Sequence, residues 1–468
     1  GTSGESLQKR KAVVKAAAIF IWERVKTKMK WMEKYKYHML ALLLGLSIFA
    51  CLMKSISNNQ QKELKKDRKS KVTEEKRQSQ ENGTSKEVED PTIRVVLKTD
   101  GFANVAHPEA GFQAAGGLKI QSGDEVRESA PGEVVTIRPD DAMFAKGTIH
   151  IEPKEEGDLI SVVTLNRGCG VPNYRGKIEL FQTAEGVVLV NELSMEQYLY
   201  GVVPSEMPAS YEPEALKVQA VCARSYAYKQ TQGLGYPEYQ AHIDDSTAFQ
   251  VYGNSGEQES TNRAVDETRG QKIWYQDQVI TAYYFSTSCG KTTTAEAWGN
   301  ASPDKAYLQS AEIKDEECDY EAKLPWYRWR AVIPSNVLTN LINLNTQTNI
   351  GNVTSLEVTK YGPGGVAQQI VAVGDQGSVT VDTENKIRTA LGGSGYTIEK
   401  QDGTVIDSMT LLPSAFFTVE YQDGNYVLNG GGFGHGIGMS QNGANEMAKK
   451  GKNYLEILTT FYHDVEVR

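Results

Sequence analysis

The stretch Asn191–Pro208 reads Asn-Glu-Leu-Ser-Met-Glu-Gln-Tyr-Leu-Tyr-Gly-Val-Val-Pro-Ser-Glu-Met-Pro, and the rest of the chain is interpreted around it. Within this stretch, Glu206 stands between Pro204 and Pro208. Proline fixes its own φ and restricts the residue before it, so the backbone around Glu206 is expected to be stiff. The apolar neighbours are Val202, Val203 and Met207. A carboxyl group in such surroundings tends to stay protonated, as a general acid must.

A second interpretation of Glu206 stays open on the residues alone. Perturbed acids are often structural, so Glu206 would then cap the following helix or face water. That helix is predicted from Glu212 to about Gln230, with Pro213 in its first turn, where a missing N–H costs nothing. Alanine and valine dominate it, which indicates close packing on several sides.

Four segments resemble the motifs of the stage II sporulation protein D family of peptidoglycan lytic transglycosylases. The first contains Glu-Gln-Tyr-Leu-Tyr-Gly-Val-Val-Pro-Ser-Glu-Met-Pro, and the last contains Gly-Phe-Gly-His-Gly-Ile-Gly-Met-Ser-Gln-Asn-Gly-Ala. In chain order the segments are Glu196–Pro208, Ala215–Ala227, Ser286–Thr292 and Gly432–Ala444. The resemblance covers most of the chain from about Ile93 to the end.

The resemblance implies that Glu206 is the single catalytic acid. It would cleave the bond between N-acetylmuramate and N-acetylglucosamine and leave a 1,6-anhydro end, without a second carboxylate. The resemblance also implies substrate-binding roles for Lys217, Arg224, Ser286, Ser288, His435 and Gln441. Its expected partners are peptide-stripped glycan strands and a wall amidase like the stage II sporulation protein P, in remodelling such as engulfment during sporulation.

Two of those residues also allow a simpler interpretation. Lys217 and Arg224 are seven residues apart and share one helix face, which also fits a solvated stripe of charge. Arginine can bind a carboxylate, such as the lactyl group of N-acetylmuramate, through two parallel hydrogen bonds. The resemblance favours a position in the substrate cleft for both residues, and more strongly for Arg224.

Two further motifs carry polar groups that suit a sugar. A strand predicted over Val279–Phe285 leads into Ser286 and Ser288, whose hydroxyls would meet a sugar or cap the next element. Gly430–Gly443 holds seven glycines around His435 and lacks the Gly-Lys-Ser/Thr ending of a nucleotide loop. We interpret its glycines as allowing close approach of a ligand, the alternative being a turn in which backbone satisfies His435.

Two rival functions have different signatures. One is a non-catalytic glycan-binding protein that enhances a wall amidase, like the LytB-type relatives that share this domain. The other is a serine hydrolase in which a serine of Ser286–Ser288 would pair with His435, although no Gly-x-Ser-x-Gly elbow surrounds these serines.

Charge and cysteine content exclude other classes. Of 50 basic and 59 acidic residues, about 20 and 11 lie in residues 1–90, so the remainder has a net charge of about −18. This argues against nucleic acid as a partner. Five cysteines are too few for a disulfide scaffold, although Cys289 and Cys318 are candidates to pair. His242 has no second nearby ligand for zinc, so we expect neither a metal nor another cofactor.

The chain begins with a basic segment, residues 1–36. The run Tyr37–Met53 has no formal charge and lies between Lys36 and Lys54, and we assign a transmembrane helix to residues 37–54. That run is near the minimum length for a membrane-spanning helix. The excess of positive charge before it places the N-terminus in the cytoplasm and the remainder outside the cell membrane. Residues 55–91 read as a flexible linker.

The remaining residues predict an α+β protein, membrane-anchored through the span. Short alternating runs predict a β-rich lobe over residues 92–190, beginning with the strand Ile93–Leu97. Residues 191–468 form a mixed α/β catalytic region with an α+β insertion over about 328–420. Glycine-rich hairpins are expected there at Gly362–Gly365 and Gly392–Gly395, and terminal helices at Ala444–Lys450 and Tyr454–Tyr462.

Overall fold

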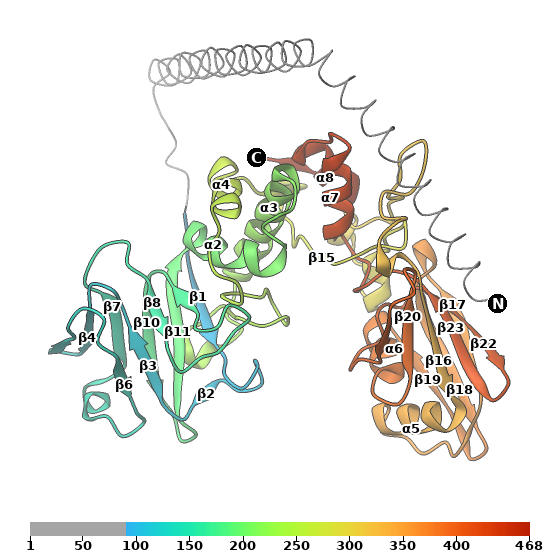
Figure 1. Cartoon of the computed structure of the whole chain (residues 1–468), viewed down its shortest axis with the longest axis horizontal. Coiled ribbons are helices and arrows are strands. Elements are labelled where there is room, and N and C mark those ends of the chain that lie inside the picture. The colour runs from blue at the N-terminus through green and yellow to red at the C-terminus, as the bar shows by residue number, and fades with distance from the viewer. Residues whose placement is uncertain (1–89) are drawn as a thin grey trace, which may run out of the picture. The chain divides into compact units, whose positions relative to one another are not determined.

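Figure 1 shows the computed structural model of the chain, which describes residues 90–468. The predicted basic segment (1–36), membrane span (37–54) and all but the end of the linker (55–91) lie outside the described residues. Within residues 90–468, no helix is both long and apolar enough to cross a bilayer. The four cysteines of this part are all free.

The first part of the described chain is rich in strands. Its largest sheet has the order β12-β1-β11-β10-β7-β4-β5, with β2 pairing β11. These strands are β1 (Thr92–Leu97), β2 (Ala106–His107), β4 (Leu118–Ser122), β5 (Glu125–Glu128), β7 (Ile149–Pro153), β10 (Lys177–Gln182), β11 (Val187–Ser194) and β12 (Ile243–Asp244). A four-stranded sheet, order β6-β3-β8-β9, is built from β3 (Ala110–Gln113), β6 (Val135–Ile137), β8 (Ile160–Val162) and β9 (Asn173–Tyr174).

Strand β11 leads directly into a helix that carries most of the first motif, and the next helix carries the second motif. Ser194 caps helix α2 (Met195–Glu206) by accepting a hydrogen bond from Gln197 N–H. Helix α3 (Pro213–Gln230) begins at the proline, as predicted, and buries most of its alanines and valines. Helices α4 (Glu259–Glu267), α7 (Gln441–Lys449) and α8 (Tyr454–Phe461) pack against α3 (Figure 1).

Two small sheets bring distant segments to these helices. Strands β13 (Ile273–Tyr275), β14 (Gln278–Val279) and β25 (Glu466–Val467) form one of them. Strand β15 (Tyr284–Phe285) pairs in parallel with β24 (Met439–Ser440) in the other. The parallel pair joins the serine segment to the glycine-rich segment, although more than 150 residues separate them.

A second group of elements lies between these two segments in the sequence. Its five-stranded sheet, order β21-β20-β16-β23-β22, has β16 (Trp329–Pro334), β20 (Thr397–Lys400), β21 (Val405–Asp407), β22 (Phe417–Gln422) and β23 (Asn425–Gly430). The hairpin strands β17 (Val353–Tyr361), β18 (Ala367–Gly374) and β19 (Gly377–Asp382) form a three-stranded sheet. Helices α5 (Ser335–Asn345) and α6 (Glu384–Leu391) pack with these strands. We call this group, Trp329–Gly430, the inserted module.

The architecture is therefore a mixture of helices and sheets, as predicted, with some local differences. The predicted strand Val279–Phe285 is wrong in its middle, because only its ends pair, in β14 and β15. Gly362–Gly365 does join two paired strands. Gly392–Gly395 does not form a hairpin, since it connects helix α6 to strand β20.

Candidate functional site

Glu206 is the last residue of helix α2, and its carboxylate turns toward another segment of the chain. Its Oε1 accepts a hydrogen bond of 2.7 Å from the Val251 backbone N–H. It does not cap the next helix, because the residue before α3 is Glu212 and makes no side-chain cap. The interpretation of Glu206 as a helix cap is therefore excluded. The residue keeps some accessible surface, while protein surrounds its carboxyl group densely.

Tyrosines and a glutamine line the protein side of this carboxyl group. The Tyr284 hydroxyl hydrogen-bonds Glu206, and it accepts a hydrogen bond of 3.0 Å from Gln250 Nε2. Tyr198 donates to the Gln250 Oε1 at 3.3 Å and is fully buried. Tyr226 is a further neighbour whose own pKa is raised, first by burial and further by the charge of Glu206. The wall around Glu206 is thus aromatic and carries no cation in these contacts.

Burial raises the pKa of Glu206 to about 7. The hydrogen bonds from Val251 N–H and Tyr284 act in the opposite direction, because they stabilise the charged form, but the loss of hydration outweighs them. A carboxyl group with such a pKa is protonated in a substantial fraction of molecules near neutral pH. That property is required of a general acid.

Gln441, from the glycine-rich segment, does reach Glu206. Its Nε2 donates to the Glu206 backbone oxygen at 3.0 Å and to Gln219 Oε1 at 3.1 Å. Both amide hydrogens of Gln441 are thereby used within the protein. Gln219 is fully buried, and its own Nε2 has no hydrogen-bond acceptor within residues 90–468. The sequence-based reasoning missed Gln219, although it lies inside the second motif.

The two predicted serines have different environments. Ser286 is half-buried, and its backbone oxygen accepts a hydrogen bond of 3.1 Å from the Asn442 side chain. Asn442 follows Gln441 directly, so Ser286 lies at the same junction of segments. Ser288, in contrast, is buried and donates its hydroxyl to the carboxylate of Glu321. Ser288 is therefore not available to a ligand as a hydroxyl donor, which corrects its predicted role.

Glu321 is a second buried carboxyl group, which the sequence-based reasoning did not identify. It is fully buried and accepts hydrogen bonds from the Ser288 N–H at 2.9 Å and from the Ser440 hydroxyl at 2.8 Å. Burial raises its pKa to about 7. A Cβ at position 443 would meet its Oε2 at 2.9 Å, which explains the glycine there. Glu321 thus ties the third motif to the fourth.

Arg224 is a core residue, which corrects the prediction that it binds substrate. It is fully buried, and its guanidinium forms two hydrogen bonds with Glu196, at 2.7 and 2.8 Å. The remaining donors reach backbone oxygens of Gln271 and Val265 and the Thr268 hydroxyl. No donor is left for a lactyl carboxylate.

Lys217 lies on the same face of α3 as Arg224, as predicted, and that face turns toward helix α4. Its Nζ forms salt bridges of 2.9 Å with Glu214 and with Glu267. Gln219, which contacts Gln441, lies two residues further along the helix and so on a different face. The predicted role of Lys217 in the Glu206 cleft is not supported by this placement.

His435 is half-buried, and its ring hydrogen-bonds two backbone groups. Its Nδ1 accepts a hydrogen bond of 3.1 Å from Ile437 N–H, and the ring also hydrogen-bonds the Tyr284 backbone. Its ring packs against Trp298 and Phe285 at 5.0 and 5.5 Å between centroids. Burial lowers its pKa to about 3, so the imidazole is neutral. The low pKa argues against His435 as a base for a serine nucleophile, and its role in sugar binding stays a prediction.

The glycines around His435 serve the chain itself. Gly434, Gly436 and Gly438 all have positive φ, which only glycine adopts readily. A Cβ on Gly436 would meet the Phe416 ring at 2.3 Å, and one on Gly438 would meet the Tyr283 backbone oxygen at 2.2 Å. These glycines therefore allow close packing of the chain against itself, rather than the predicted close approach of a ligand.

Comparison with known proteins places this arrangement in a class. A family model described as stage II sporulation protein matches residues 183–275, which include Glu206 and α3. A second model, for a domain of unknown function, matches residues 302–438. The chain thus combines the core of a family of sporulation proteins with a stretch whose function has not been assigned.

Three relatives are similar over most of residues 90–468. Stage II sporulation protein D of Bacillus subtilis is 31% identical over 306 residues, covering 62% of this chain and 78% of that protein. An uncharacterised protein of Brachyspira hyodysenteriae is 31% identical, covering 63% of this chain and 72% of that protein. An amidase enhancer of Bacillus subtilis is 30% identical, covering 56% of this chain but only 39% of that protein. The chain belongs to the stage II sporulation protein D family.

Proposed function

We propose that this protein is a lytic transglycosylase that cleaves peptide-stripped peptidoglycan strands, with Glu206 as its single acid and base. The observation that carries the proposal is the state of that carboxyl group. It is held at a helix end, its pKa is raised to about 7, and the residue keeps some accessible surface.

The proposed reaction consumes no water. Protonated Glu206 gives its proton to the oxygen that links C1 of N-acetylmuramate to N-acetylglucosamine, and the C1–O bond breaks. The C6 hydroxyl oxygen of the same muramyl residue bonds to C1, and its proton returns to the Glu206 carboxylate. One carboxyl group thus serves both steps, whereas hydrolytic glycosidases use a pair.

The other residues of the site would hold Glu206 and the glycan. Tyr284 and Val251 N–H orient the carboxyl group, and Gln441 fixes the end of α2 through the Glu206 backbone oxygen. Ser286, which is half-buried, is the polar residue we assign to sugar binding. A wall amidase that strips the peptides, a cell-membrane anchor and a role in engulfment belong to the same proposal.

A non-catalytic role is the second candidate, because one relative is named an amidase enhancer. The two candidates make different products. We would incubate the full chain with peptide-free glycan strands, without any amidase, and identify the products by mass spectrometry. The proposal predicts strands with 1,6-anhydro ends. Products that form only when an amidase is added would establish the enhancer function instead.

A further inference from the structure

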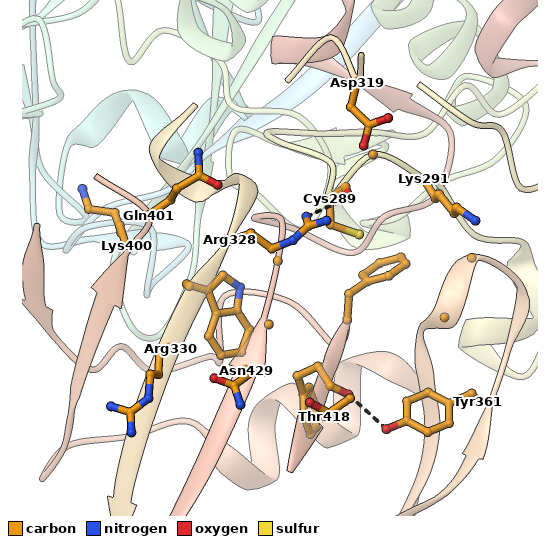
Figure 2. A pocket seen from close by; sticks show the side chains of 18 of the residues that line it. Cys289, Lys291, Asp319, Arg328, Arg330, Tyr361, Lys400, Gln401, Thr418 and Asn429 are labelled. Atoms are coloured by element: carbon orange, nitrogen blue, oxygen red, sulfur yellow. Dashed lines mark hydrogen bonds between the residues drawn. The ribbon is translucent and has the colours of Figure 1, made fainter. Parts of the chain in front are cut away.

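A large cavity within residues 90–468 has a lining that does not include Glu206. It has a volume of about 1080 Å³ and lies between the inserted module and the core motifs (Figure 2). Outside the inserted module, its lining includes Cys289–Lys291, just after the serine segment, and Gly431 in the glycine-rich segment. We call this cavity the module groove.

One wall of the module groove is a row of polar side chains across the five-stranded sheet. Arg330 on β16 lies opposite Asn429 on β23, which in turn lies opposite Thr418 on β22. Cross-strand partners project from the same face of a sheet, so the three side chains form a continuous row (Figure 2). All three are exposed. On the other side of Arg330, Glu399 on β20 lies opposite it, so the row offers a carboxylate, a guanidinium, an amide and a hydroxyl in sequence.

The groove holds unpaired positive charge. The Arg330 guanidinium has no ion-pair or hydrogen-bond partner anywhere in the described part of the chain. Arg328, in contrast, donates to the Cys289 and Tyr327 backbone oxygens and lies over the Tyr327 ring at 3.9 Å. Lys400 lies over the Trp326 ring at 5.3 Å and has no salt bridge within residues 90–468. Arg330 therefore offers its whole guanidinium to an anion.

The groove also holds negative charge, and this limits the kind of anion. Its lining carboxylates are Glu312, Asp319 and Glu399, and Glu312 already pairs with Lys291 and Lys314. A densely phosphorylated polymer would be repelled by these groups and by the net charge of about −18 of residues 91–468. A polymer with many hydroxyls and widely spaced single charges suits this lining better. Tyr361, which is 47% exposed, offers an aromatic ring for a sugar face.

A short segment of the chain connects the groove wall to a neighbour of Glu206. Cys289 is five residues after Tyr284, whose hydroxyl contacts Glu206. Five residues of fully extended chain span at most about 18 Å. The Cα atoms of Tyr284 and Cys289 are therefore no further apart than this.

We propose that the module groove is a second binding site for the carboxylate-bearing glycan strand, remote from the cleaved bond, with Arg330 and Lys400 contacting its lactyl carboxylates. The proposal rests on the proposed function for the identity of the strand. It gives a role to the stretch 302–438, which a family of unknown function matches.

Binding is tested in the full chain carrying Glu206→Gln, so that no cleavage disturbs the measurement. In that background, Arg330→Gln with Lys400→Gln is compared with Lys386→Gln, an exposed lysine on α6 outside the groove. Peptide-free glycan strands and chitin oligosaccharides of equal length are the ligands, since chitin lacks the lactyl carboxylate. Losing charge-assisted contacts should weaken binding of the strands about tenfold and leave chitin binding unchanged.

The proposal is overturned if the double variant and the Lys386→Gln control bind the strands with equal affinity, or if the double variant loses chitin binding equally. Tighter binding of poly(glycerol phosphate) than of strands with the same number of charges would also overturn it, in favour of a phosphate polymer. The proposed function fails separately, when the wild-type chain yields no anhydro ends, because binding is measured without cleavage.

Discussion

Glu206 and Glu321 are chemically alike and differ in their surroundings. Burial raises the pKa of each to about 7. Glu321 is fully buried and accepts hydrogen bonds from Ser288 and Ser440, which belong to two separate motifs. Glu206 has a single backbone donor and the Tyr284 hydroxyl, and it retains accessible surface.

The difference shows that a raised pKa alone does not identify a catalytic acid. Glu321 holds the chain together, because its carboxylate connects segments more than 100 residues apart. Glu206 accepts fewer hydrogen bonds than Glu321, and the residue keeps some accessible surface. Access to a ligand, added to a raised pKa, is what separates a candidate acid from a buried structural one.

The largest expected effect is on cleavage. Glu206→Gln should lower the rate of anhydro-product formation about 10³-fold or more, because the glutamine amide is not acidic enough to protonate the glycosidic oxygen. Glu321→Gln should keep the rate within about tenfold of wild type, since it touches no substrate. Initial rates on peptide-free strands check both values. Equal losses in the two variants would abolish the distinction between the two carboxyl groups.

Stability should respond in the opposite order. Glu321→Ala leaves the Ser288 and Ser440 donors buried without an acceptor and should lower the free energy of unfolding by about 4 kcal/mol. Glu206→Ala frees one backbone donor beside accessible surface and should cost about 1 kcal/mol. Urea denaturation measures both. A larger loss for Glu206→Ala would mean that Glu206 is the structural residue.

The pH dependence of stability sharpens the comparison further. A carboxyl group with a raised pKa in the folded chain stabilises it fully below about 4.5, and this contribution is lost as pH rises through about 7. The Glu321→Gln variant lacks this titrating group, so it does not lose that contribution to stability as the pH rises. Relative to wild type, Glu321→Gln should therefore gain up to about 3 kcal/mol in the free energy of unfolding between pH 4.5 and pH 8. Parallel curves for the two proteins would contradict the raised pKa.

Removing the Tyr284 hydroxyl should have the smallest effect. Its hydrogen bond lowers the pKa of Glu206, so Tyr284→Phe should raise that pKa. The fall in cleavage rate on the alkaline side should then move to higher pH by less than about one unit. Tyr421→Phe, an exposed tyrosine of the inserted module, serves as the control. A shift to lower pH would show that Tyr284 acts in another way.

The sequence predicts the local features that neighbouring residues determine. Glu206 stood out through its flanking prolines and apolar neighbours, and the helix from Pro213 through its composition and first turn. Glu321 lies in an ordinary polar segment, and both of its partners are distant in the sequence, so no local pattern marks it. The parallel pairing of β15 with β24 brings Ser288 and Ser440 together, and this pairing depends on the fold.

Predictions that depended on a side chain's surroundings fared worse. The seven-residue spacing of Lys217 and Arg224 fits two residues on one solvated helix face. Arg224 is buried instead, because its ion-pair partner Glu196 lies on the preceding helix. His435 lies in a glycine-rich segment that suggests a ligand site, but its ring contacts neighbouring aromatic rings and a backbone N–H. A polar residue in a motif can be retained for packing as well as for binding, and only the fold separates the two.

The titration of the Glu206 carboxyl group in the intact protein tests the account most directly. Difference infrared spectra of wild type against Glu206→Gln isolate the carboxyl band that the substitution removes. The account predicts that this band titrates with a midpoint at about pH 7, because burial disfavours the charged form. A midpoint near 4.5, the ordinary value for glutamate, would show that Glu206 is ionised at neutral pH and would contradict its role as the acid.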